Sequence, residues 1–277
     1  MSWVRKYMIR HYRPGLGNWQ GGRDGFRTLW LAGMGIAVFF LIWTLLGFFI
    51  FTRPHFSQFT GFLPGPTLKA MVKLLDDHAF WLSVVASVRR ITVGIGIAFA
   101  VGLPCGLLIG YFRTLRTITY TPIQFVRMIS PLSWMPIALL IFTTFESAIY
   151  FLITMATIWP IILNSSLGVS RVNPQWIKMA KNQGANDRQI LLHIILPAAI
   201  PYILTSLRLA LGVAWIVLVP VEFLGISSGL GYIINDARDT MEYDRLMAIV
   251  LAIGVIGFIL DGSIQLMQKM FRWSWVN

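Results

Sequence analysis

Three long stretches of this chain carry no charged side chain, and they constrain the fold more than any other feature. They are residues 31–51, 91–112 and 147–170. A helix rises 1.5 Å per residue, so about 20 residues cross the roughly 30 Å of hydrocarbon in a bilayer. We therefore expect each stretch to form a membrane-spanning helix.

Three further stretches are apolar but interrupted. Residues 117–145 contain Arg127, Pro131 and Pro136, residues 197–224 contain Arg208 and Glu222, and residues 246–267 contain Asp261. With them, the sequence predicts six spans and an all-α membrane protein. The composition agrees, since 56% of the residues are hydrophobic and only 12% are charged, against about 25% charged in a typical soluble domain. This excludes a soluble enzyme and a free nucleic-acid-binding protein.

The basic residues indicate which side of the membrane the termini occupy. The chain has 23 Lys and Arg and a formal net charge of +12. Six spans place 14 of these residues on the side of the termini, 7 on the other side, Arg89 and Arg90 among them, and Arg127 and Arg208 within spans. Cytoplasmic loops collect Lys and Arg. We therefore expect both termini in the cytoplasm. This topology explains the positive net charge, which does not require a nucleic-acid partner.

The segments outside the spans differ in character. Residues 1–30 are basic and aromatic, and they form either an interfacial helix on the anionic inner leaflet or a basic tail without fixed structure. Residues 52–88 form an extracytoplasmic segment, in which 66–87 predicts one amphipathic helix. Residues 89–270 form a core with five spans, and 271–277 form the cytoplasmic C-terminus. The single cysteine, Cys105, offers neither a disulfide nor a cysteine metal site.

A polar loop at residues 171–196 separates the fourth and fifth spans on the side of the termini. It predicts a short helix, a break at Gly184, and a second helix that Asn186 or Asp187 caps. Pro197 begins the next span. A compact helical element between two spans suits the docking of a cytoplasmic partner.

The spacing within this loop resembles a signature of permease subunits of binding-protein-dependent ABC importers: Glu-Ala-Ala, three residues, Gly, nine residues, Ile, one residue, Leu-Pro. The second alanine and all later positions match, at Ala180, Gly184, Ile194, Leu196 and Pro197. Lys178 and Met179 replace the first two residues. The resemblance implies a coupling helix that binds an ATPase through Lys178, Ala180, Gly184, Ala185, Asn186, Ile194, Leu196 and Pro197.

Further segments resemble the nitrate, sulfonate, taurine and bicarbonate branch of that family. They are LPGPT at 63–67, SVRRITVGIGIAFAVGLPCGLLIGY at 87–111, SPLSWMPIALL at 130–140, LRLALGVAW at 207–215 and SSGLGYIINDAR at 227–238. The resemblance implies a type I ABC importer permease fold in the inner (plasma) membrane of a prokaryote. It also implies import of a small anion by alternating access, with nitrate, bicarbonate or a sulfonate-like solute as substrate.

The same resemblance implies the partners: cytoplasmic ABC ATPase subunits, an extracytoplasmic solute-binding protein and a second copy of the chain, all at the lipid bilayer. The sequence contains no Gly-x4-Gly-Lys-Ser/Thr run for ATP phosphates, and no metal-ligand or catalytic spacing. We therefore expect a non-catalytic subunit that binds no cofactor or metal, with ATP and Mg²⁺ held by the ATPase.

Charged residues within spans are costly and mark candidate positions on a substrate pathway. A helix broken by prolines is tolerated where its backbone lines a cavity. On these grounds the predicted pathway comprises Arg127, Ser130, Pro131, Ser133, Trp134, Arg208, Trp215 and Glu222. Two alternatives stay open. In the first, Arg208 or Arg127 braces the fold through Glu222, Asp261 or helix-end carbonyls. In the second, the prolines only kink a packed helix.

Three other functions are weighed against the importer. An ion-coupled secondary transporter predicts acidic or histidine relays within spans, for which Asp261 is the single weak candidate. An intramembrane enzyme requires a catalytic pair that the sequence does not offer. The third alternative is an ABC permease for a non-anionic small organic solute.

Overall fold

The computed structural model describes residues 23–51 and 53–273, and all regular structure in this part of the chain is helical. Five helices are long and apolar enough to cross a membrane, and a bent pair brings the number to six, as predicted. The long helices are α2 (Arg23–Phe51), α4 (His78–Tyr111), α7 (Phe145–Ser170), α10 (Leu196–Gly225) and α12 (Tyr243–Trp273). The predicted segments at 1–22 and 274–277 lie outside the described residues.

The bent pair corresponds to the third predicted span. It consists of α5 (Arg113–Val126), the short 3-10 helix η2 (Pro131–Trp134) and α6 (Met135–Ile141), and its two parts meet at 82°. Pro131 and Pro136 each lie in the first turn of their helix, where a missing N–H costs nothing, although neither can continue a preceding helix. The predicted break at these prolines is confirmed.

A row of small residues on α4 forms the closest helix contact of the core. Gly94, Ala98, Gly102, Gly106 and Gly110 are all buried and recur at every fourth residue, so they share one face. A methyl group added at Gly106 would lie 2.7 Å from a carbonyl oxygen of α7. In a bilayer, lipid tails are as apolar as leucine, so close packing of this kind stabilises helix pairs.

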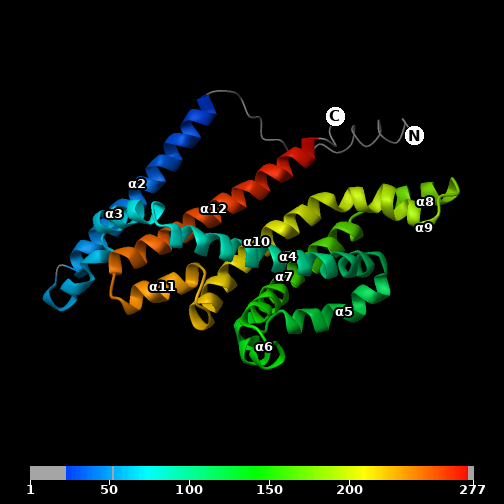
Figure 1. Ribbon diagram of the computed structural model, residues 1–277. Helices are drawn as coiled ribbons and strands as arrows, with labels where there is room; N and C mark the ends of the chain where they lie inside the picture. The colour runs from blue at the N-terminus through cyan, green and yellow to red at the C-terminus, as the bar shows by residue number, and fades with distance from the viewer. Residues whose placement is uncertain (1–22, 52, 274–277) are drawn as a thin grey trace.

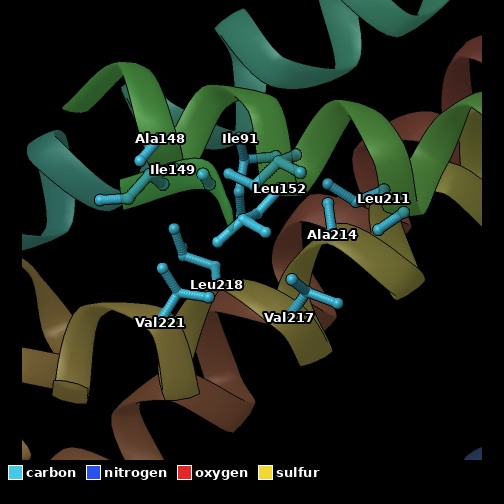
Figure 2. Close-up of a cluster of buried hydrophobic side chains, with 12 residues drawn as sticks. Ile91, Ala148, Ile149, Leu152, Leu211, Ala214, Val217, Leu218 and Val221 are labelled. Atoms are coloured by element: carbon cyan, nitrogen blue, oxygen red, sulfur yellow. The ribbon is translucent and has the colours of Figure 1, made fainter. Parts of the chain in front are cut away.

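The other face of α7 packs against α10 (Figure 2). Leu152 of α7 and Leu218 of α10 lie between the two helices, and both are fully buried. Ile91 of α4 joins the same cluster. The helices α4, α7 and α10 therefore form the packed centre, on which the more peripheral elements are arranged.

Besides the bent pair, the shorter elements lie at the two ends of this centre (Figure 1). At one end lie η1 (Pro54–Phe62), α3 (Pro64–Leu75) and α11 (Leu230–Asp239). At the opposite end lie α8 (Pro174–Asn182) and α9 (Asp187–Ile190), followed by the π-helix η3 (Leu191–Ile195). The loop at 171–196 thus stands apart from the α3 and α11 region.

Two expectations about the segment before the second span are wrong. Residues 66–87 do not form one helix, because α3 ends at Leu75 and Asp77 caps a new helix, accepting a hydrogen bond from the Ala79 N–H. That helix is α4, which runs on for 34 residues, or about 51 Å. Arg90 consequently lies inside a long helix and is fully buried. It is not an outer surface charge.

Candidate functional site

The loop at 171–196 is a small, well-capped helical element. Asn173 caps α8, and Asn186 caps α9 through a reciprocal pair of hydrogen bonds with Gln189. Between the helices, Gly184 has φ of +80°, a left-handed conformation that glycine adopts without strain. The predicted break at Gly184 is confirmed. Of the two residues predicted as the cap, Asn186 and Asp187, the structure shows Asn186.

One side of this element packs on the ends of the long helices. Ile190 and Ile195 are fully buried against Val169 and Ile203. The partly buried side chains against the same cluster include four residues of the predicted coupling set: Ala180, Ala185, Ile194 and Leu196. They hold the element on the membrane core, which restricts how it tilts independently of α7 and α10.

The opposite side of the element is exposed. Lys178, Met179, Gly184 and Asn186 lie there, and nothing in the described part of the chain approaches within 4 Å of the point where a Gly184 side chain would begin. Exposed basic and apolar side chains on a rigid base form a surface on which a soluble protein can dock.

A second candidate site is an open groove of about 550 Å³ between α5, η2, α7 and α10. Arg127, Pro131 and Trp134 line it, together with Trp159 and Asn164 of α7. Ser130 and Ser133 are exposed but do not line this groove. The structure thus brings together three of the predicted pathway residues and adds two that the sequence did not single out.

Arg208 makes a bidentate ion pair across α10 and α12. Its Nε and Nη2 donate to the two Asp261 oxygens at 2.7 and 2.9 Å. Gln265 donates to the same carboxylate. Both charged side chains remain partly exposed, at 44% and 34%. Of the alternatives left open, bracing through Asp261 is the one that the structure supports for Arg208.

Trp215 lines a different cavity, of about 250 Å³, between α10 and α12. Gly212, Gly254 and Gly257 form much of its wall, and Asp261 lies at its edge. Trp215 and Arg208 therefore belong to one side of α10, while Leu209 and Val213 face the Arg127 groove on another. The eight predicted pathway residues do not form a single cavity.

Glu222 belongs to a buried ionic network centred on Arg90. Arg90 Nη1 lies 2.6 Å from Glu222 Oε1, and Arg90 Nη2 lies 2.5 Å from Glu146 Oε1. The side chains of Arg90 and Glu222 are fully buried, and Glu146 is 35% exposed. The network joins α4, α7 and α10, because each helix supplies one charged residue.

Polar groups near the start of α11 complete the network. The Ser87 hydroxyl donates to the Glu222 carboxylate at 2.8 Å, and the Gly231 N–H donates to it at 3.0 Å. Arg90 donates to the Ser228 carbonyl oxygen at 2.9 Å. Gly229 has φ of +106°, and a methyl group there would lie 2.5 Å from Arg90 Nη1. The network therefore fixes the entry of α11 against three long helices.

The sequence did not reveal this network, because the second span was predicted to begin at Ile91, where the uncharged run begins. Had the helix been started at His78, Arg90 would have stood about three turns inside it. The sequence then contains two candidate partners near helix ends, Glu146 and Glu222. Residues 23–51 and 53–273 contain no group of three or more side chains arranged to hold a metal ion.

Together, a helical core crossing the membrane, a span broken at prolines and an exposed capped loop define a polytopic permease. The chain belongs to the family described as the inner membrane component of binding-protein-dependent transport systems, which matches residues 102–273, more than half of its length. It is the transmembrane permease subunit of an ABC importer, a multi-pass protein of the inner membrane.

Curated relatives are similar in sequence over most of the chain. The bicarbonate transport system permease protein CmpB of Synechococcus elongatus is 33% identical, over 93% of this chain and 94% of the relative. The nitrate import permease protein NrtB of Synechocystis is 30% identical, over 70% of each chain. The chain is thus similar to permeases of the bicarbonate and nitrate branch.

Solved structures show the same fold. A permease chain of a bacterial ABC transporter involved in alginate import has a TM-score of 0.60 and 17% identity, covering 90% of this chain and 98% of that one. A chain of the MetNI methionine ABC transporter, in an inward-facing form, has a TM-score of 0.55 and 16% identity, covering 69% and 96%. The fold is that of type I ABC importer permeases.

Proposed function

We propose that this permease imports a small anion, and that ATPase subunits bind the loop at 171–196 and drive the import. Those subunits bind ATP and Mg²⁺ and hydrolyse the ATP, and this chain is non-catalytic. A solute-binding protein delivers the anion to the α3 and α11 end. Two copies of the chain enclose the pathway, and both termini lie in the cytoplasm, where the loop meets the ATPase.

The observation that carries this proposal is the construction of the loop. Its buried side is anchored by Ile190 and Ile195, while Lys178, Met179 and Gly184 stand exposed. A push on the exposed side is therefore transmitted to α7 and α10 and is not absorbed by a hinge within the loop. This is the mechanical requirement for coupling ATP hydrolysis to a change in the membrane helices.

The anionic substrate rests on two independent supports. The relatives named above are a bicarbonate and a nitrate permease. In this chain, Arg127 places a cation in a membrane groove, and its guanidinium makes no ion pair or hydrogen bond within residues 23–51 and 53–273. A cation left without a partner inside a membrane favours an anion at that position.

The test uses the complex that copurifies with the tagged chain from native membranes, reconstituted into vesicles with its binding protein. We expect uptake of nitrate, bicarbonate or a sulfonate that requires ATP. Gly184→Arg should abolish uptake while the chain still inserts. Met179→Asp tests the same surface without backbone strain, and Lys269→Asp, an exposed charge change near the end of α12 and outside the loop, is the matched control. Uptake that continues without an ATPase, or that Gly184→Arg and Met179→Asp leave unchanged, contradicts the proposal.

A further inference from the structure

The helix α3 exposes a row of apolar side chains, although it is not a membrane span. Its 12 residues extend about 18 Å, too short to cross about 30 Å of hydrocarbon. One face, with Ala70 and Leu74, is buried in a cluster with α11 and α12. On the other face lies the α3 stripe, which consists of Leu68, Val72 and Leu75, each at least 45% exposed. Their spacing of four and three residues places them side by side, and such a row of exposed apolar side chains marks an interaction surface.

The α3 stripe is continuous with the lipid-facing side of α4. The indole N–H of Trp81, in the first turn of α4, donates to the Leu75 carbonyl oxygen at 2.9 Å, so the end of the stripe lies against the start of α4. Trp81 is itself exposed. Further exposed apolar residues follow along α4: Leu82, Val85, Val93, Ile97, Val101 and Leu108. Because α4 is a membrane span, this side faces acyl chains, which are as apolar as leucine.

Two cations flank the α3 stripe. Lys69 and Lys73 are one turn apart and exposed. In the part of the chain that the structure describes, neither ammonium group makes an ion pair or a hydrogen bond, and Lys73 is not paired with the exposed Asp76 at the end of α3. Tryptophan is enriched at the membrane–water interface, which is the level that Trp81 indicates for this surface. An apolar stripe beside lysines is typical of helices that bind anionic membrane surfaces.

We propose that α3 is an interfacial helix that binds an anionic phospholipid, with the α3 stripe against its acyl chains and Lys69 and Lys73 paired with its phosphate-bearing headgroup. A phospholipid matches both the stripe and the cations. A soluble partner on the same face would interrupt the lipid surface that Trp81 continues onto α4. Since α3 packs on α11 and α12, the bound lipid holds this end of the protein at the bilayer surface, a role beyond the import reaction.

The apolar contact is tested on the full-length chain in lipid vesicles. Val72→Cys in a Cys105→Ser background carries a single spin label, and Leu68→Cys provides a second position. We expect each label to be reached more readily by oxygen, which concentrates in lipid, than by a water-soluble nickel complex. Met241→Cys, in the exposed turn between α11 and α12, is the matched control and should show the reverse. Labels on α3 that behave like the Met241 label overturn the proposal.

The headgroup preference is measured with a fluorophore on Val72→Cys in the same background, quenched by brominated phosphatidylglycerol or brominated phosphatidylcholine. We expect phosphatidylglycerol to be preferred about fivefold or more, because one lysine near an anionic surface contributes about 1 kcal/mol. Lys69→Gln with Lys73→Gln should remove most of this preference while phosphatidylcholine still quenches. Lys269→Gln, an exposed lysine near the far end of α12, should leave it unchanged. Equal quenching by the two lipids, or a preference that the double variant retains, contradicts the headgroup assignment.

A protein partner on this face gives a different result. If the solute-binding protein shields the Val72 label from water and neither lipid quenches it, the α3 stripe binds that protein and the lipid proposal fails. None of these measurements requires ATP or transport. Their outcome is therefore independent of ATP-dependent uptake, whose loss or persistence in Gly184→Arg tests the proposed function alone.

Discussion

Removing the positive charge at the centre of the buried network should destabilise the protein strongly. In Arg90→Met the side-chain volume is nearly kept, but Glu222 is left as a fully buried carboxylate without its cation. Breaking a buried ion pair by deleting one partner costs about 3–5 kcal/mol. We expect a loss of this size in the free energy of unfolding.

The matched control is an exposed ion pair in the same protein. Arg238 pairs with Asp239 at 2.8 Å, and both side chains are more than half exposed. Surface pairs of this kind contribute about 0–1 kcal/mol, and the Arg238 guanidinium also lies over the Phe223 ring, a contact of about 0.5–1 kcal/mol at an exposed site. Arg238→Met should therefore cost clearly less than Arg90→Met. The comparison separates burial of the charge from the mere loss of an arginine.

A double variant tests whether the cost comes from the unpaired charge. Glu222→Gln keeps an oxygen that accepts from Ser87 and Gly231, while it removes the negative charge that Arg90 balances. Arg90→Met with Glu222→Gln should therefore be less destabilised than the sum of the single variants, with a coupling of about 1–3 kcal/mol.

The assay is reversible unfolding in mixed detergent micelles, followed by tryptophan fluorescence and repeated for each variant. Arg90 is not the essential counter-charge of Glu222 if Arg90→Met loses no more stability than Arg238→Met, or if the single effects at Arg90 and Glu222 simply add.

Three further predictions follow from local geometry. Gly106→Val should cost about 1–3 kcal/mol by overpacking the α4–α7 contact, measured by the same unfolding assay, whereas Gly96→Val, with nothing within 4 Å, should not. Gly229→Ala should lower thermal stability, because φ of +106° disfavours a side chain and Arg90 and Glu222 leave no room for one; an unchanged melting temperature contradicts this. Arg208→Asp should lower the melting temperature, and adding Asp261→Arg should restore part of it; no rescue would mean that their ion pair does not brace α10 against α12.

Much of the fold follows from the sequence because a bilayer imposes simple rules. Uncharged runs of about 20 residues must be helices that satisfy their own backbone hydrogen bonds, so residues 31–51 and 147–170 were sufficient to place α2 and α7. Because a proline has no N–H to donate within a helix, the break of the third span at Pro131 could also be predicted. Local chemistry limited the helix cap to Asn186 or Asp187, and the structure shows Asn186.

The start of α4 was not predicted, because it depends on contacts between residues that are far apart in the sequence. A charged residue is usually read as the end of a span, but Arg90 is buried because Glu146 and Glu222, 56 and 132 residues away in the chain, compensate it. Such compensation is a property of the folded structure, and no local pattern reveals it.

The candidate pathway was predicted only in part for a similar reason. Arg127, Pro131 and Trp134 were found because they are close together in sequence, whereas Trp159 and Asn164 reach the groove from another helix. Arg208 and Glu222 are charged like pathway residues but have partners, Asp261 and Arg90, that only the packing of the helices supplies. The distinction between a paired and an unpaired charge requires the structure.

The most direct test of the account is a crosslink between the loop and the ATPase. The chain has one cysteine, Cys105, so Lys178→Cys in a Cys105→Ser background supplies a single reactive thiol on the exposed side of α8. We predict that a short thiol-to-amine crosslinker joins this position to the copurifying ATPase subunit, and that Gly65→Cys at the opposite end yields no such product. Failure of Lys178→Cys to crosslink, or equal crosslinking from Gly65→Cys, would contradict the claim that this loop is where ATP hydrolysis is coupled to transport.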